Sequence, residues 1–301
     1  MHLIVPFAST VSDAGCEALT QLATPALDSL LARCSEADRD AGDETALTTP
    51  HERALARALG WAPLATLPWA ARQAAGDGVD VGDAAWGLLT PVHWRVGTDA
   101  IHLADPRDLA LDEAASRALM AAVRPLFEGE GFRLAWGAPL RWYASHPSFA
   151  NFPTASLDRV IGRNVDRWLP SQREARLVRR LQNEVQMLLH AHPINAEREG
   201  AGTLAVNSFW LSGCGVFQSE AAHDAQLDDR LRAPALTEDW TAWTAAWSTL
   251  DAALPAIRLS RLTLCGERSA VTFEPAEPTR WQRLARPFTS ARPARELLAL
   301  L

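Results

Sequence analysis

The chain contains no lysine: all 29 of its basic residues are arginine. A catalytic lysine that forms a Schiff base, and a P-loop that holds phosphates through its lysine, are therefore excluded. The formal net charge of −7 argues against a general nucleic-acid binder, which needs a basic face. We expect no nucleic-acid partner.

Other features are scarce as well. The four cysteines, Cys16, Cys34, Cys214 and Cys265, form no C-x-x-C pair, so zinc ribbons and thioredoxin-like redox motifs lack support. No apolar run reaches the length of a transmembrane helix, and the first residues lack the basic and long apolar regions of a signal peptide. We expect a cytoplasmic protein with reduced thiols and no membrane partner.

What remains is the composition of a folded protein, because 301 residues with 48% hydrophobic content suffice for a full core. Apolar spacing and capping signals, among them a capping box of Thr49 and Glu52, predict helices at 11–22, 24–34, 49–60, 111–131, 170–193 and 237–254, the last with a stripe of tryptophans on one face. Apolar runs predict strands at 2–7, 85–97, 100–106 and 204–215, two strands within 132–144, and a hairpin at 256–275. The polar segment 35–48 and the Ala-, Gly- and Pro-rich segment 61–84 are expected to be connections.

The histidines give no metal-binding motif. Only His190 and His192 lie two residues apart, and they are followed directly by a proline, with no acid close by to complete a ligand set. The simpler interpretation places His190 in the last turn of a helix, where a cation complements the helix dipole. Cys214, between two glycines, is either a small buried residue of a tight turn or a thiol activated at a helix start. We expect no metal and no cofactor.

Arginines are the better candidates, because a guanidinium binds phosphate or carboxylate through two parallel hydrogen bonds. Arg159 and Arg163 lie four residues apart and could share a helix face, and Arg198 follows Asn195 after the break at Pro193. These residues either form an anion pocket or are surface cations of a chain without lysine. The arginine-rich tail at 280–301 leaves the same choice open.

Several segments resemble, in order, the cofactor-independent phosphoglycerate mutases of the alkaline phosphatase superfamily. TPALDSLLAR (24–33) resembles the TPNLDxLA helix of that superfamily, and 85–145 resembles the inserted domain of the archaeal-type mutases. A third segment, 188–215, resembles a mutase motif through His192, Pro193, Asn195, Arg198, Asn207, Trp210, Gly213 and Gly215. A closer resemblance links nearly the whole chain to a bacterial group of RpfE-type regulatory or phosphoglycerate-mutase-like proteins, through IVPFAS, PHERALARALG, TASLDRVIGR, LQNEVQMLL and NSFWLSG.

The chain departs from the mutases at the positions where that resemblance implies metal ligands. The mutases end their first strand in Asp-Gly, whereas here the strand reads IVPFAST, with no acid before Asp13. Where they carry Gly-Asp-His, this chain has Glu267 and Arg268, and a guanidinium has no lone pair to offer a metal. After the Gly-x-Gly, only His223 and Asp224 lie nearby. A binuclear centre that lacks most of its ligands should not form.

We therefore predict an α/β fold with an alkaline-phosphatase-like core sheet flanked by helices. The core is expected to comprise 1–84 and 146–301, with an inserted α+β subdomain at 85–145. The favoured function is that of a non-catalytic, regulatory relative of the mutases, which binds a small anionic ligand or a protein partner. Its candidate ligand-binding residues are Arg141, Arg159, Arg163, His192, Asn195, Arg198 and Asn207.

Two other hypotheses stay open. The chain is an active mutase or a metal-dependent phosphohydrolase if Asp13, Glu267, His223 and Asp224 converge within about 10 Å on one metal site. It is a regulatory adaptor if the tail at 280–301 captures a partner.

Overall fold

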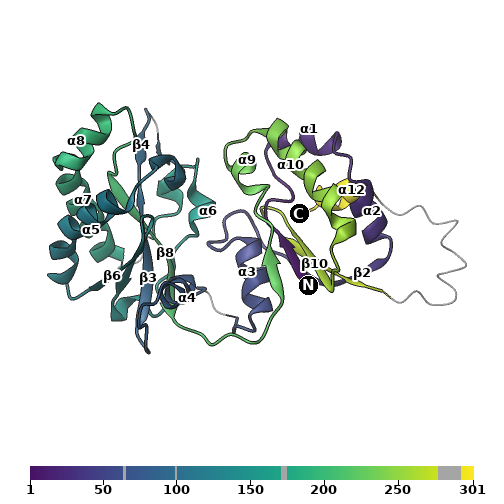
Figure 1. The fold of residues 1–301 in the computed structure, drawn as a ribbon, viewed down its shortest axis with the longest axis horizontal. Coiled ribbons are helices and arrows are strands. Elements are labelled where there is room, and N and C mark those ends of the chain that lie inside the picture. The colour runs from purple at the N-terminus through teal and green to yellow at the C-terminus, as the bar shows by residue number, and fades with distance from the viewer. Residues whose placement is uncertain (64–65, 99, 171–174, 277–292) are drawn as a thin grey trace, which may run out of the picture. The chain divides into compact units, whose positions relative to one another are not determined.

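The computed structural model describes residues 1–301 except 64–65, 99, 171–174 and 277–292 (Figure 1). The chain forms two compact units, Met1–Ala62 with Glu220–Leu301, and Pro63–Ser219. Each unit has a β-sheet flanked by helices, which confirms the predicted α/β class. Among the described residues, no helix combines the length and hydrophobicity that crossing a membrane requires.

The first unit contains the strands β1 (His2–Val5), β2 (Cys34–Asp40), β9 (Ala225–Leu227), β10 (Arg261–Cys265) and β11 (Ala270–Pro275). They form one sheet in the order β2-β11-β10-β1-β9. β1 runs parallel to β10 and β9, whereas β11 and β2 extend the sheet antiparallel. The antiparallel pairing of β10 with β11 confirms the predicted hairpin.

The helices of the first unit are α1 (Asp13–Thr20), α2 (Pro25–Leu31), α3 (Pro50–Ala58), α9 (Arg232–Leu236), α10 (Trp240–Ala253) and α12 (Ala294–Leu298). β1 is buried on both faces, as its continuous apolar run predicts. Leu3 and Val5 share a core with Trp243 and Trp247 of α10, while Ile4 packs on the opposite side with α3. Most of the arginine-rich tail falls on 277–292, outside the described residues.

The second unit contains β3 (Ala85–Val92), β4 (Trp94–Val96), β5 (Ile101–Leu103), β6 (Arg133–Ala138), β7 (Arg141–Ser145) and β8 (Ser208–Val216). Four of them form an antiparallel sheet in the order β6-β7-β3-β8, and β4 and β5 form a separate hairpin. The strand predicted at 85–97 is divided into β3 and β4, so three strands rather than two precede the helix, and β6 and β7 follow it as predicted.

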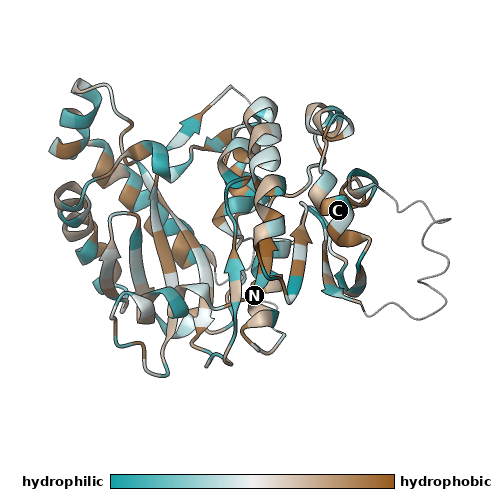
Figure 2. Cartoon of the chain, turned by 45° about the vertical axis from the view of Figure 1, so that its right-hand side comes forward, coloured by the Kyte–Doolittle hydropathy of each residue, from teal (hydrophilic) through white to brown (hydrophobic). Residues whose placement is uncertain are grey.

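The helices of the second unit are α4 (Trp69–Gly76), α5 (Glu113–Glu128), α6 (Leu157–Val160), α7 (Ala175–His190) and α8 (Pro193–Gly200). α5 and α7 cover one face of the four-stranded sheet and share a core with Trp142. α4 covers the other face, where Trp86 and Tyr143 are buried against its alanines. Figure 2 shows hydrophobic residues, in brown, along the strands and within the helices.

The two compact units divide the chain at other places than the predicted domains. The whole predicted insert, 85–145, lies within the second unit, but that unit also takes in α4 and the segment 146–219. The reason is strand pairing, because β8 completes a sheet whose other three strands come from 85–145. α7 likewise packs on that sheet.

Two predicted connections contain regular structure, so both predictions are wrong. The polar segment 35–48 supplies most of β2, an edge strand whose charged side chains face solvent. A search for apolar runs does not detect such a strand. The segment 61–84 supplies α4. Its Ala70, Ala71 and Ala74 are fully buried, and alanine both favours a helix and permits close packing on a sheet.

The segment 188–215 also differs in detail from the prediction. Pro193 ends α7 as expected, but it is also the first residue of α8, a position where proline is favoured. The Gly-x-Gly lies inside β8 rather than in a turn. Gly213 has a φ of +63°, and a Cβ there would lie 2.9 Å from the backbone nitrogen of Ala70. These glycines therefore kink the strand and admit α4.

Candidate functional site

The carboxyl edge of the parallel strands is the first place to look for a site, because open α/β sheets bind ligands there. In the first unit, β1 leads into the loop 6–12 and β10 leads into the turn 266–269. The Glu267 carboxylate accepts hydrogen bonds from the Thr10 hydroxyl at 3.0 Å and from the Val11 main-chain N–H at 3.1 Å. This carboxylate therefore joins the two loops.

Arg268, the residue after Glu267, also bonds to a partner within the protein. Arg268 donates from Nε and pairs through Nη2 with the Glu44 carboxylate, at 2.9 and 2.8 Å. The main-chain N–H groups of Arg268 and Ser269 both donate to the Leu301 carbonyl oxygen at 3.1 Å. A Cβ on Gly266 would lie 2.5 Å from the carbonyl carbon of Leu301, so glycine is what permits this close approach.

The start of α3 lies beside the end of β1. The predicted capping box is confirmed, since the Thr49 hydroxyl accepts from the Glu52 N–H and the Glu52 carboxylate accepts from the Thr49 N–H. The buried His51 ring has its Nε2 3.1 Å from the Thr49 hydroxyl and its centroid 5.5 Å from that of Phe7. Phe7 has a φ of +55°, a strained value for a bulky residue.

The four residues required for a rearranged metal site do not converge. Asp224 lies at the amino edge of the sheet, where it pairs with the N-terminal amine of Met1 at 2.9 Å, and His223 precedes it. Asp224 also accepts a hydrogen bond from Ser260, just before β10, whereas Glu267 lies beyond the other end of β10, which spans about 13 Å at about 3.3 Å per residue. Asp13 is exposed at the start of α1.

The donor set at the carboxyl edge does not fit the metal pair that the mutase resemblance implies. Glu267, the acid at the mutase ligand position, is bonded to Thr10 and Val11, and the next residue is a fixed cation. Two further acids at this edge, Asp228 after β9 and Asp40 at the end of β2, pair with Arg230 and Arg53. Across the part of the chain that the structure describes, no three His, Cys, Asp or Glu side chains gather as metal ligands would.

Three of the seven predicted ligand-binding residues hold the backbone of the second unit. The Asn195 side chain, 4% exposed, donates to the carbonyls of Leu189 and Val206 and accepts from the Val206 N–H. Asn207 bridges the main chain of Trp94 at 2.8 and 2.9 Å. Arg198 donates to the carbonyls of Leu204 and Leu109.

The other four predicted ligand-binding residues lie on different elements, and two of them make hydrogen bonds that hold nearby structure. His192 caps α8, because its Nδ1 accepts from the Ile194 N–H. Arg141 forms a two-bond ion pair with Asp77, with both distances 2.8 Å. Arg159 is buried at 2% exposure in α6, and Arg163 follows that short helix. Arg141 bonds to Asp77 whereas Arg198 of α8 bonds to Leu204 and Leu109, so these two arginines do not share a partner.

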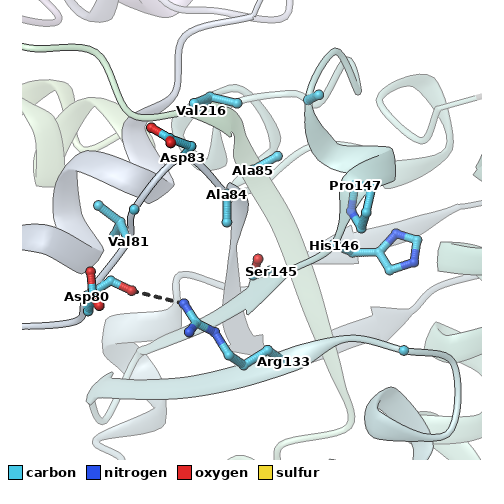
Figure 3. Close-up of a pocket in the computed structure, with 13 residues that line it drawn as sticks. Asp80, Val81, Asp83, Ala84, Ala85, Arg133, Ser145, His146, Pro147 and Val216 are labelled. Carbon is cyan, nitrogen blue, oxygen red and sulfur yellow. Dashed lines mark hydrogen bonds between the residues drawn. The ribbon is translucent and has the colours of Figure 1, made fainter.

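A different part of the second unit is hollowed. A pocket of about 610 Å³ opens at one end of the four-stranded sheet, a volume in the usual range for small-ligand sites (Figure 3). It is bordered by the loop 80–84, the start of β6, the end of β7 and the end of β8. Its polar lining residues are Asp80, Asp83, Arg133, Ser145 and His146.

Arg133 is held in one orientation at the wall of this pocket. Its guanidinium lies over the buried Trp86 ring, 4.6 Å from the centroid, and Nη2 donates to the Asp80 carbonyl at 2.9 Å. Strand pairing explains the position, because Arg133 and Trp86 both lie opposite Ser145 on β7, whose small side chain leaves the guanidinium room to cross.

His146 completes the polar lining. Its Nδ1 accepts from the Ser148 N–H at 3.2 Å, which leaves the proton of the neutral ring on Nε2. Burial lowers the pKa of His146, so the ring is neutral at pH 7. The sequence motifs give no signal for this pocket, because its residues meet only through the register of β6, β7 and β3.

No protein-family model matches the sequence, and no curated protein matches it. Among solved structures, the chain is similar to a cofactor-independent phosphoglycerate mutase from Thermoplasma acidophilum, with 14% identity, 90% of this chain and 89% of the other covered, and a TM-score of 0.38. It is also similar to the PH0037 protein from Pyrococcus horikoshii, with 12% identity, coverage of 93% and 88%, and a TM-score of 0.43.

Proposed function

We propose that this chain is a non-catalytic, phosphoglycerate-mutase-like protein that acts by binding a small charged ligand or a protein partner. The observation that carries the proposal is the state of the carboxyl edge in the first unit. Glu267 stands where the mutases carry a metal-binding aspartate, and its carboxylate accepts hydrogen bonds from Thr10 and Val11. Arg268 follows it as a permanent cation.

The sequence resemblance and the geometry support the proposal together. The resemblance implies the mutase scaffold, while the positions that should hold two metal ions hold an occupied carboxylate and an arginine. A divalent ion would have to displace two hydrogen bonds from Glu267 and tolerate the Arg268 charge nearby. A regulatory role of the RpfE-type group fits a scaffold that binds without turning over.

The test is a joint measurement of metal and turnover. The purified protein is loaded with Mn²⁺ or Zn²⁺, desalted and analysed for bound metal by mass spectrometry. It is then assayed with 3-phosphoglycerate for mutase activity and with p-nitrophenyl phosphate for phosphatase activity. We expect neither stoichiometric metal nor turnover. Stoichiometric metal with turnover that Glu267→Gln abolishes would refute the proposal.

A further inference from the structure

The pocket at the end of the four-stranded sheet holds charges of both signs. Arg133 supplies a cation whose orientation is fixed by Trp86 and by the Asp80 carbonyl. Asp80 and Asp83 line the same pocket, and their carboxylates have no hydrogen-bond or ion-pair partner among the described residues. Figure 3 shows Asp83 and Arg133 on different sides of Ser145. Arg133 and Asp83 are therefore separated, opposite charges in the pocket, whereas Asp80 lies beside Arg133.

Each simple kind of ligand leaves one of these charges unmatched. An anion would find Arg133 but would be repelled by Asp80 and Asp83. A cation or a metal ion would find the carboxylates but would be repelled by the guanidinium, which is never deprotonated in proteins. Only a ligand with both charges matches both walls.

The rest of the lining favours a particular shape of ligand. Beside Ser145 and His146, the lining includes the aliphatic side chains of Val81, Ala84, Pro147 and Val216. A short hydrocarbon stretch suits such a lining, because it removes apolar surface from water. The free N–H groups of the Arg133 guanidinium match a carboxylate in a two-bond arrangement.

We propose that this pocket binds a small zwitterion, with its carboxylate on Arg133, its ammonium group on Asp83 and an aliphatic spacer between them. The inference rests on the proposed binding function and deepens it, because it names the site and the class of ligand. Small ω-amino acids, in which a hydrocarbon chain separates the two charged groups, carry this chemistry.

Three matched probes test the charge pattern by isothermal titration calorimetry: 6-aminohexanoate, hexanoate and hexylamine. The zwitterion should bind at least about 10-fold more tightly than either single-charge probe, a difference of about 1.4 kcal/mol. Arg133→Gln should remove the advantage of 6-aminohexanoate over hexylamine. Asp83→Asn should remove its advantage over hexanoate.

Control variants separate a local effect from a general one. Arg117→Gln removes another arginine that lies over a tryptophan, Trp136, outside the pocket, and Asp108→Asn removes an exposed acid. Both should bind 6-aminohexanoate as the unchanged protein does. Equal affinity for all three probes, or unchanged binding in both pocket variants, overturns the pocket assignment. That result leaves the proposed function standing, which fails instead if metal-dependent turnover is found.

Discussion

Replacing Asp77 by asparagine tests whether Arg141 is structural or available to a ligand. Asp77 follows the end of α4, and its carboxylate accepts from Arg141 Nε and Nη2, both at 2.8 Å, and from the Tyr143 hydroxyl at 2.6 Å. It therefore ties α4 to β7. Asp77→Asn keeps the shape of the side chain but removes the charge and turns one acceptor into a donor that faces Arg141.

The expected loss follows from exposure and bond type. Hydrogen bonds to charged groups contribute about 1.5–3 kcal/mol each when sheltered. The Asp77 side chain is 17% exposed, but that of Arg141 is 43% exposed, so solvent screens the ion pair. We expect a loss of about 2 kcal/mol for the second unit, which corresponds to a fall in Tm of about 4–8 °C for a unit of this length.

The same contact predicts a dependence of stability on pH. The hydrogen bond from Arg141 lowers the pKa of Asp77 in the folded protein. A lowered pKa stabilises the fold above the unfolded value of about 3.9, and the stabilisation is lost as the pH falls through the folded value. Asp77→Asn should therefore reduce Tm at pH 7, and its effect should shrink as the pH falls through the lowered pKa of Asp77 in the folded protein.

Differential scanning calorimetry at pH 7 and in acid measures both effects. The control is Glu113→Gln, which removes the exposed pair with Arg117, whose side chains are 61% and 53% exposed. That change should cost less than about 0.5 kcal/mol. If Asp77→Asn unfolds at the same temperature as the unchanged protein at pH 7, the Asp77–Arg141 pair does not stabilise the fold. Arg141 would then again be a candidate ligand-binding residue.

Three further predictions concern packing and reactivity. Asn195→Ala removes three buried hydrogen bonds and should lower the free energy of unfolding by about 3 kcal/mol in urea titrations, with 6-aminohexanoate binding retained. Gly266→Ala should lower Tm in calorimetry, because its Cβ meets a carbonyl carbon at 2.5 Å; an unchanged Tm contradicts that contact. Iodoacetamide should label Cys16 before Cys214 and Cys265, since burial raises the pKa of the latter two thiols; mass spectrometry of peptides reads the order.

Apolar patterns and caps were enough to predict much of the fold. The continuous run at β1, the capping box at Thr49 and the tryptophan stripe of α10 each express a local rule that packing does not oppose. The edge strand β2 was not predicted, because a strand with exposed faces needs no apolar residues and therefore shows no apolar pattern. The helix α4 was not predicted, because its segment is rich in alanine and glycine, a composition that was interpreted as a connection.

The candidate site was harder to predict, because polar residue types do not reveal what they bond to. Asn195 and Asn207 look like ligand-binding residues in the sequence, yet their amides bond to the protein backbone. The pocket with Arg133 depends on which residues lie opposite Ser145. Strand register arises from pairing between separate segments, so it cannot be predicted from any one of them.

The most direct test of the central claim is turnover by the metal-loaded protein. Phosphorus NMR can follow 3-phosphoglycerate in the presence of the protein and Mn²⁺, with inorganic phosphate and 2-phosphoglycerate as the products to detect. If Glu267 and Arg268 have replaced a metal centre, the 3-phosphoglycerate signal stays unchanged. Formation of either product, at a rate that scales with protein and that Glu267→Gln abolishes, would contradict the account.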